Sequence, residues 1–322
     1  MAEFAVQGKR SNLGDMRRSE ERVALLALLL GRGSGWSGIV EDILDTDSVW
    51  TVLEKTLGSR DVLFDVADDP VEQAMSRARA LLEHCESRGI GVRAFWEDDY
   101  PAALREIHEM PPVVFTRGEQ ADDRRAIAVV GSRRASPRGL EIAGNIAEAL
   151  VDREVTVVSG LAAGIDTAAH TAALRQRGRT VAVIGTGINR YYPWENRELQ
   201  DEIAARGMVL SQFLPDAPPT RQSFPMRNAV MSGYAAATIV VEAGEHSGAR
   251  IQARYALKHG RPVIFPRELL ANQWARDYAE RPGVYVVAGM ADLMEIVDDI
   301  LAESTMTVDE LVASLEAAEL GW

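Results

Sequence analysis

Residues 126–166 read AIAVVGSRRASPRGLEIAGNIAEALVDREVTVVSGLAAGID, and this stretch decides the fold. It contains two short, nearly all-apolar runs, 126–130 and 155–158, separated by residues 140–151, in which apolar positions recur at helical spacing. An apolar strand, an amphipathic helix and a second apolar strand are typical of a parallel βαβ unit whose sheet is covered on both faces. The stretch therefore predicts an α/β domain.

The same alternation continues to residue 266. We expect further strands at 180–184, 208–210, 238–241 and 262–265, and helices at 166–177, 195–206 and 247–259. Together these segments predict a Rossmann-like, mostly parallel sheet with helices on both faces and a core between residues 125 and 266.

The segments on either side of this core have a different pattern. Residues 1–90 are predicted as a small helical N-terminal domain with helices at 20–30, 49–57 and 71–86. Two strand-like pieces, 91–96 and 112–116, lead into the Rossmann-like domain, which we place at 91–290 and which ends in a strand at 284–287. Residues 291–322 are predicted as acidic helices, 292–301 and 308–319, the second preceded by a capping-box spacing between Thr307 and Glu310.

The charge of the 322-residue chain is unevenly distributed. A net charge of −13 argues against a nucleic-acid ligand, because neutralising phosphates requires lysine and arginine. Residues 126–265, however, carry 16 basic and 12 acidic side chains, and both flanking parts are acidic. The core domain alone therefore remains compatible with an anionic ligand.

The chain has no secretory signal among its first twenty residues and no apolar run near the ~20 residues of a membrane span. We therefore expect a cytoplasmic protein without a membrane partner. The single cysteine, Cys85, excludes an internal disulfide and a zinc cluster of cysteines.

Four predicted strand ends carry small and polar residues. Carboxyl ends of parallel strands meet at one edge of a sheet, where glycine lets backbone approach a phosphate and helix N-termini offer free N–H groups. We therefore predict an anion-binding groove along this edge. The four ends begin at Gly131-Ser132-Arg133, at Ser159-Gly160, at Gly185-Thr186-Gly187 and at Glu242-Ala243-Gly244.

Several patterns at these ends allow two interpretations. Asp166 and His170 are an acid–base pair or, as we favour, a helix-start carboxylate and a histidine that anchors the loop. We place Ser132, Ser159 and Ser247 at helix starts, as caps or phosphate donors, and no Gly-x-Ser-x-Gly elbow is present, so we predict no catalytic residue.

The sequence also gives no support for a cofactor or a metal. His246 lies near Glu242, but two residues make a poor metal site. Neither a P-loop nor a Gly-x-Gly-x-x-Gly motif with its acidic partner occurs.

Five segments in a fixed order carry a resemblance to a known family. They are 128–133 with Ser136 and Gly139, 158–166 with His170, 192–196, 224–228 with Ser232-Gly233, and 241–243 with Ser247-Gly248. The chain resembles a divergent member of the DprA/Smf family of DNA-processing proteins.

This resemblance implies a non-enzymatic, homodimeric protein that binds single-stranded DNA in natural transformation or recombination and delivers it to the RecA recombinase. The resemblance also implies that Ser132, Arg133, the loop 159–166, Arg227 and Asn228 contact DNA. The small and polar residues at the predicted strand ends are further candidates. The candidates for DNA or phosphate contacts are Gly131, Ser132, Arg133, Arg138, Ser159, Gly160, Gly164, Asp166, His170, Gly185, Gly187, Phe224, Arg227, Asn228, Ser247 and Gly248.

Aromatic residues near these ends offer faces on which bases stack. The candidates are Tyr191, Tyr192, Trp194 and Phe224. For Tyr192 and Trp194, packing in the core is an equally good interpretation.

The chain departs from the family pattern at three positions, Ala229 for an arginine, Asn189 for an aspartate and Arg267 for the glycine after Pro266. Two alternative functions stay open. One is a sensor of a small nucleotide at the same edge. The other is a LOG-like nucleotide phosphoribohydrolase, whose Pro-Gly-Gly-x-Gly-Thr-x-x-Glu signature is missing here.

Overall fold

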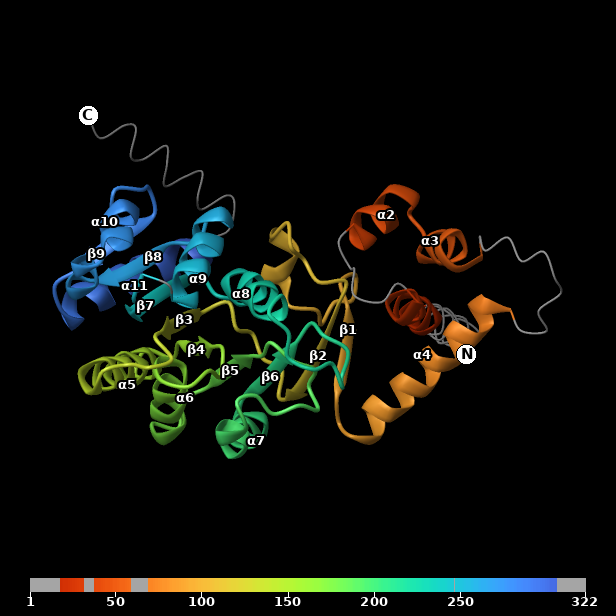
Figure 1. The fold of residues 1–322 in the computed structure, drawn as a ribbon, viewed down its shortest axis with the longest axis horizontal. Helices are drawn as coiled ribbons and strands as arrows, with labels where there is room; N and C mark the ends of the chain where they lie inside the picture. The colour runs from red at the N-terminus through yellow and green to blue at the C-terminus, as the bar shows by residue number, and fades with distance from the viewer. Residues whose placement is uncertain (1–17, 32–37, 59–68, 246, 306–322) are drawn as a thin grey trace, which may run out of the picture. The chain divides into compact units, whose positions relative to one another are not determined.

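The structure of the chain is a computed structural model that describes residues 18–31, 38–58, 69–245 and 247–305 (Figure 1). The chain forms two compact units. The N-terminal unit comprises the residues up to Tyr100 together with Met110–Val114, and the C-terminal unit comprises Pro101–Glu109 and the residues from Phe115 onward.

The N-terminal unit is mainly helical, as the sequence predicts. It contains a helix over 18–31, α2 (Ile39–Thr46), α3 (Val49–Leu53), the π-helix η1 (Glu54–Gly58), α4 (Pro70–Ser87) and the strand β1 (Gly91–Ala94). α4 begins where Asp69 accepts a hydrogen bond from the Val71 amide at 2.9 Å and where Pro70 fits the first helical turn. α2 was not expected from the sequence.

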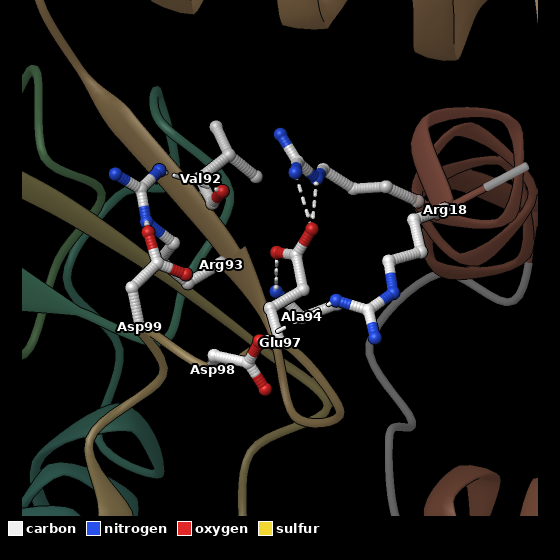
Figure 2. A network of polar contacts seen from close by, with 8 residues as sticks. Arg18, Val92, Arg93, Ala94, Glu97, Asp98 and Asp99 are labelled. Carbon is white, nitrogen blue, oxygen red and sulfur yellow. Dashed lines mark hydrogen bonds and ion pairs between the residues drawn. The ribbon is translucent and has the colours of Figure 1, made fainter. Parts of the chain in front are cut away.

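A polar network holds the first helix of this unit to the turn after β1 (Figure 2). The buried Glu97 accepts hydrogen bonds from Arg22 Nε at 2.9 Å and from the Ala94 amide at 2.7 Å. Arg18 lies 3.5 Å from Asp98, and Arg93 pairs with Asp99. Because the Glu97 carboxylate accepts hydrogen bonds from both the helix and the strand, it fixes the position of the helix against the strand.

The C-terminal unit is built on a twisted sheet in which the described strands lie in the order β2-β6-β5-β4-β3-β7-β8-β9. All neighbouring strands pair in parallel except β2 and β6, which are antiparallel, so the predicted mostly parallel sheet is confirmed. The strands are β2 (Val113–Gly118), β3 (Ala126–Gly131), β4 (Thr156–Ser159), β5 (Thr180–Val183), β6 (Met208–Ser211), β7 (Ala237–Glu242), β8 (Val263–Pro266) and β9 (Val284–Val287).

Helices cover both faces of this sheet, as predicted (Figure 1). α5 (Pro137–Val151), α6 (Ile165–Arg175) and α7 (Arg197–Arg206) lie on one face, and α8 (Ser223–Tyr234) and α9 (Gly248–Lys258) lie on the other. α11 (Met290–Thr305) packs into the same core as α5 and α6, where its Val297 joins Ile146 and Ala169. Shorter elements complete the unit: η2 (Ala102–Glu106), η3 (Trp194–Asn196), η4 (Arg267–Ala271) and α10 (Gln273–Ala279).

The sequence did not predict α8, α10 or η4. α8 is buried on almost all sides, so its sequence lacks the polar stripe that marks a surface helix. The expected strand at 284–287 is β9, and the expected helix at 292–301 lies within α11.

Some expectations cannot be compared with the fold. The helix at 308–319 and the Thr307–Glu310 cap lie outside the described residues, and the division at residues 90 and 290 stays a prediction. In the described part of the chain, no helix combines the length and apolar character needed to cross a membrane.

Candidate functional site

The order of the strands reverses between β3 and β7. The chain passes from β3 through β4 and β5 to β6 on one side, and from β7 through β8 to β9 on the other. Open α/β sheets bind their ligands at the carboxyl ends of the strands at such a reversal, because the two following loops diverge there and leave a crevice. The chain has a cleft of about 620 Å³ at this point.

The cleft is lined by the ends of β3 and β7, by the loop after β4 and by one side of α8 and α9. The lining residues are Val130, Gly131, Ser132, Arg133, Arg134, Ala162, Asp166, Phe224, Pro225, Arg227, Asn228, Met231, Gly244, Ser247, Gly248, Ala249, Ile251 and Gln252.

Nine of the sixteen candidates from the sequence lie in this lining, and three of the four strand ends reach it. The nine are Gly131, Ser132, Arg133, Asp166, Phe224, Arg227, Asn228, Ser247 and Gly248. The structure tests their positions and not their ligands, so their contacts with DNA stay predictions.

The loop after β3 presents an arginine to solvent. The Ser132 amide donates to the Glu242 carbonyl at 2.6 Å, and Ser132 Oγ accepts from the Arg134 amide at 3.1 Å. This tight turn leaves Arg133 exposed, with its guanidinium carbon 5.2 Å from the centre of the Phe224 ring. Arg133 therefore offers a charge and a stacked ring at the same place.

The predicted helix start at Ser132 is wrong, because Ser136 is the residue that caps α5. Ser136 Oγ accepts from the Gly139 amide at 3.0 Å, and the Ser136 amide and hydroxyl donate to the Glu242 carboxylate at 3.1 and 2.6 Å. A Rossmann fold usually holds a phosphate at the start of this helix. In this chain, a carboxylate of the protein already lies there.

Arg138 follows this cap but lies outside the cleft lining. It is exposed, and its guanidinium lies 3.4 Å from the Glu268 carboxylate. A pair exposed to this degree contributes little to stability, so Arg138 is free to exchange partners.

The floor of the cleft contains a buried arginine. Arg227 is only 5% exposed, and its guanidinium donates to the carbonyls of Val183, at 2.7 Å, and Gly160. A Cβ atom on Gly160 would collide with this guanidinium, which explains the glycine. The Arg227 side chain thus joins α8 to the ends of β4 and β5.

Asp166 lies beside Arg227 and holds the loop after β4. Its Oδ2 accepts from the amides of Gly160, at 3.1 Å, and Ala162, at 3.3 Å. Burial raises the pKa of Asp166, and the nearby Arg227 charge and the two amides oppose this rise. Burial likewise lowers the pKa of Arg227 to about 10, so Arg227 stays charged at neutral pH.

His170 is fully buried behind this floor and lies outside the cleft lining. Its Nδ1 lies 2.7 Å from the Thr180 hydroxyl, which itself donates to the Val157 carbonyl at 2.7 Å. Burial, with the Arg227 charge, lowers the pKa of His170 to about 3, so the ring is neutral at physiological pH. The bonds of Asp166 fit the predicted helix-start carboxylate, whereas His170 bonds to Thr180 at the start of β5 and not to the loop, so its role as a loop anchor stays a prediction.

Five other candidates shape the loops from outside the lining, and their phosphate contacts stay predictions. The helix start predicted at Ser159 is wrong, because Ser159 ends β4 and its Oγ donates to the Val129 carbonyl at 2.6 Å. Gly164 has a φ of +83°, in the region that favours glycine, and approaches the Ser132 carbonyl. The remaining three are Gly160, against Arg227; Gly185, against the Phe224 ring; and Gly187, against the carbonyls of Leu214 and Pro215.

The predicted helix start at Ser247 is present. Ser247 is the N-cap of α9, and its Oγ accepts from the Ala249 amide at 3.2 Å. His246, considered with Glu242 as a metal pair, lies outside the described residues. Among the residues described, no three His, Cys, Asp or Glu side chains are grouped to hold a metal ion.

Aromatic rings continue from the cleft onto the neighbouring loop after β5. The Tyr192 ring lies 5.3 Å from the Phe224 ring, and Trp194 lies 5.9 Å from Tyr191 in an edge-to-face arrangement. Tyr192 is 41% exposed and Trp194 is 64% exposed. The interpretation that these two residues pack in the core is therefore wrong, and both rings are accessible to a ligand.

The sequence missed several lining residues, among them Arg134, Met231, Ile251 and Gln252. Arg134 follows Arg133 directly, and the run of two arginines after a strand was a usable signal. Met231, Ile251 and Gln252 reach the cleft from α8 and α9, which only the tertiary fold brings together. Ala229 is buried on α8 and is not among the lining residues.

Comparison with known proteins gives concordant matches. The model of the family described as DNA recombination-mediator protein A matches residues 91–305. The DNA processing protein DprA of Streptococcus pneumoniae is 42% identical over 169 residues, which are 52% of this chain and 60% of that protein. The matches span 44% to 66% of the curated relatives from Synechocystis, Bacillus subtilis and S. pneumoniae.

Solved structures show the same fold. The crystal structure of DNA processing protein A from S. pneumoniae matches with a TM-score of 0.64 and 30% identity, covering 86% of this chain and 95% of that one. DNA processing protein A from Helicobacter pylori, whose structure describes a single-stranded DNA binding mode, matches with a TM-score of 0.59 and 23% identity, covering 66% and 96%.

Proposed function

Because this chain belongs to the DNA recombination-mediator protein A family, we propose that its cleft and the aromatic residues beside it bind single-stranded DNA. The S. pneumoniae and H. pylori proteins are DNA processing proteins, and the latter binds single-stranded DNA. The resemblance to the DprA/Smf family seen in the sequence is thereby confirmed. That this chain binds single-stranded DNA is our proposal.

The observation that supports this proposal most directly is the pairing of Arg133 with Phe224. A phosphate binds an exposed guanidinium, and a base stacks on a ring, so the two side chains suit adjacent parts of one nucleotide. Tyr192 extends the ring surface from Phe224. Bases in a duplex are already stacked and paired, so this surface favours an unpaired strand.

The two alternative functions receive less support from the cleft. A nucleotide-binding Rossmann site uses free amides at helix starts for the phosphates. Here Glu242 and Asp166 accept hydrogen bonds from the amides of Ser136, Gly160 and Ala162. We therefore propose a binding protein without catalysis. Release of adenine from AMP, or thermal stabilisation by a mononucleotide but not by an oligonucleotide, would favour the alternatives.

The proposal is tested by titrating a fluorescent oligonucleotide at about 50 and 200 mM salt, a range in which phosphate contacts lose affinity strongly. Arg133→Ala is expected to lower the affinity roughly tenfold, since charge-assisted hydrogen bonds are the strong ones. It is also expected to reduce the slope of log affinity against log salt by about 0.7, the value for one phosphate of a single strand.

Arg175→Ala is the matched control, because Arg175 is exposed on α6, outside the cleft lining, and pairs with Glu148. The proposal fails if the protein does not bind at low salt, or if both variants bind like the unmodified protein.

Three further parts of the proposal rest on membership of the family. They are delivery of the bound strand to a RecA-type recombinase, action as a homodimer and a cytoplasmic location. Light scattering measures the oligomeric state. Recombinase filament assembly on coated DNA, with and without the protein, measures delivery, and unchanged assembly would remove that part.

A further inference from the structure

Two arginine–aromatic clusters lie on this edge of the sheet. The inner cluster consists of Arg133 and Phe224, which line the cleft, and of Tyr192, whose ring lies beside Phe224. The outer cluster consists of Tyr191, Trp194 and Arg197, with the Arg197 guanidinium carbon 5.2 Å from the Trp194 ring centre. None of the three residues of the outer cluster lines the cleft.

We propose that Trp194 in the outer cluster is a second base-stacking position, which binds a nucleotide of the same strand beyond the cleft. The inference rests on the proposed function, because it extends the path of the single strand. It predicts that affinity depends on strand length through one identified ring.

The exposure of Trp194 is the first argument. A tryptophan that is 64% exposed leaves a large apolar ring in water, which costs free energy unless a ligand covers it. The ring is held in place, because Tyr191 meets it edge to face and the Tyr191 hydroxyl donates to Asp201 at 2.9 Å. A preorganised ring loses little entropy when a base stacks on it.

The position of Arg197 is the second argument. Its ion pair with Glu198 has a distance of 3.4 Å, and the Glu198 side chain is 91% exposed. Water screens such a pair, so Arg197 can leave its partner at little cost. A base can then stack on Trp194 in its place, or on the guanidinium plane that already covers the ring.

Continuity with the cleft is the third argument. Tyr191 of the outer cluster is followed directly by Tyr192 of the inner cluster, whose ring contacts Phe224. Adjacent residues of the loop after β5 thus belong to the two clusters.

The charges around Trp194 indicate which kind of contact it makes. Glu195 and Glu198 follow it in sequence and offset the charge of Arg197. Stacking, and not phosphate neutralisation, must therefore supply the affinity here. Removal of the ring is expected to lower affinity without changing the salt dependence, whereas removal of Arg133 changes both.

The experiment compares oligothymidylates of about 4 and about 16 nucleotides, the limits of common single-strand site sizes. Trp194→Ala is expected to lower the affinity for the longer strand roughly tenfold, to leave the short strand unchanged and to preserve the salt slope. Trp194→Phe should restore most of the loss, and Leu44→Ala, at a side chain 63% exposed in the N-terminal unit, should cause none.

The difference in emission between the unmodified protein and Trp194→Phe isolates the fluorescence of Trp194, which a stacked base is expected to quench. If the unmodified protein binds both strand lengths and the Trp194→Ala variant binds each with the same affinity as the unmodified protein, the inference is wrong and the proposed function stands. If the unmodified protein binds neither, the proposed function itself fails. If Trp194→Ala lowers the affinity for the short and the long strand by the same factor, the proposal of a second stacking position is also wrong.

Discussion

Arg227 and Arg133 line the same cleft, but they differ in burial and in the partners of their guanidinium groups. Arg227 on the floor is buried and donates to backbone carbonyls of two strands, whereas Arg133 at the rim is exposed and rests on the Phe224 ring. The same contrast separates Asp166, which holds a loop, from the exposed rings of Tyr192 and Trp194. The floor therefore maintains the shape of the cleft, and the rim carries the exposed groups that we propose contact DNA.

This difference teaches that a motif arginine is not by itself a phosphate ligand. Both residues occur in segments that match the family pattern, and the sequence treats them alike. Burial distinguishes them, because a guanidinium whose donors are used by the backbone has few left for a phosphate. Loss of Arg227 should then act through folding, and loss of Arg133 through binding.

The largest expected effect is on the free energy of unfolding of Arg227→Met. The variant removes the positive charge near the buried Asp166 carboxylate and the Arg227 donors to the Gly160 and Val183 carbonyls, which costs about 3–5 kcal/mol. Urea unfolding measures it, and Arg133→Met should stay within about 0.5 kcal/mol of the unmodified protein. Normal stability of Arg227→Met combined with lost DNA binding would break the distinction between floor and rim.

Gly160→Ala tests the same floor from the backbone side. The added Cβ meets the Arg227 guanidinium, so we expect a loss of up to about 3 kcal/mol in the free energy of unfolding. Gly144→Ala on α5 is the matched change, since its Cβ meets only Ala172 Cβ at an ordinary 3.8 Å. That variant should gain about 0.5–1 kcal/mol from helix propensity. Equal effects of the two substitutions would show that Arg227 adapts freely.

The floor should also respond to acid through His170. Its pKa falls from an ordinary 6.5 to about 3 in the folded state, so the unfolded chain takes up a proton first as the pH falls. The stabilisation is complete above pH 6.5 and is lost as the pH approaches 3, with about 2 kcal/mol lost at pH 5. His170→Gln should flatten the stability profile between pH 6.5 and 3. An unaltered profile would contradict a neutral, buried imidazole.

Much of the fold of the C-terminal unit follows from local pattern. The strands from β3 to β8 are almost entirely apolar because both faces of the sheet are covered, and the helices between them carry a clear apolar stripe. The strand ends at Gly131 and Ser247 were likewise predictable, because glycine and serine at such ends mark tight turns and caps.

The state of each site residue was not predictable in the same way. Phe224 and Arg227 lie on α8, which the sequence did not predict, because a helix buried all round has no periodic polar face. Without that helix, the burial of Arg227 and the exposure of Arg133 could not be distinguished. Gly185 and Gly187 lie outside the cleft lining, and their missing side chains make room for protein atoms.

The Glu242 carboxylate at the start of α5 has a consequence for competition inside a cell. Free nucleotides are abundant there, and an open amide pocket would be occupied by them most of the time. The protein's own carboxylate fills the place that a terminal phosphate would take. In the proposed function, a single strand then gains affinity by covering several rim positions in succession. Under the proposed function, Glu242 thereby reduces competition from free nucleotides at the start of α5.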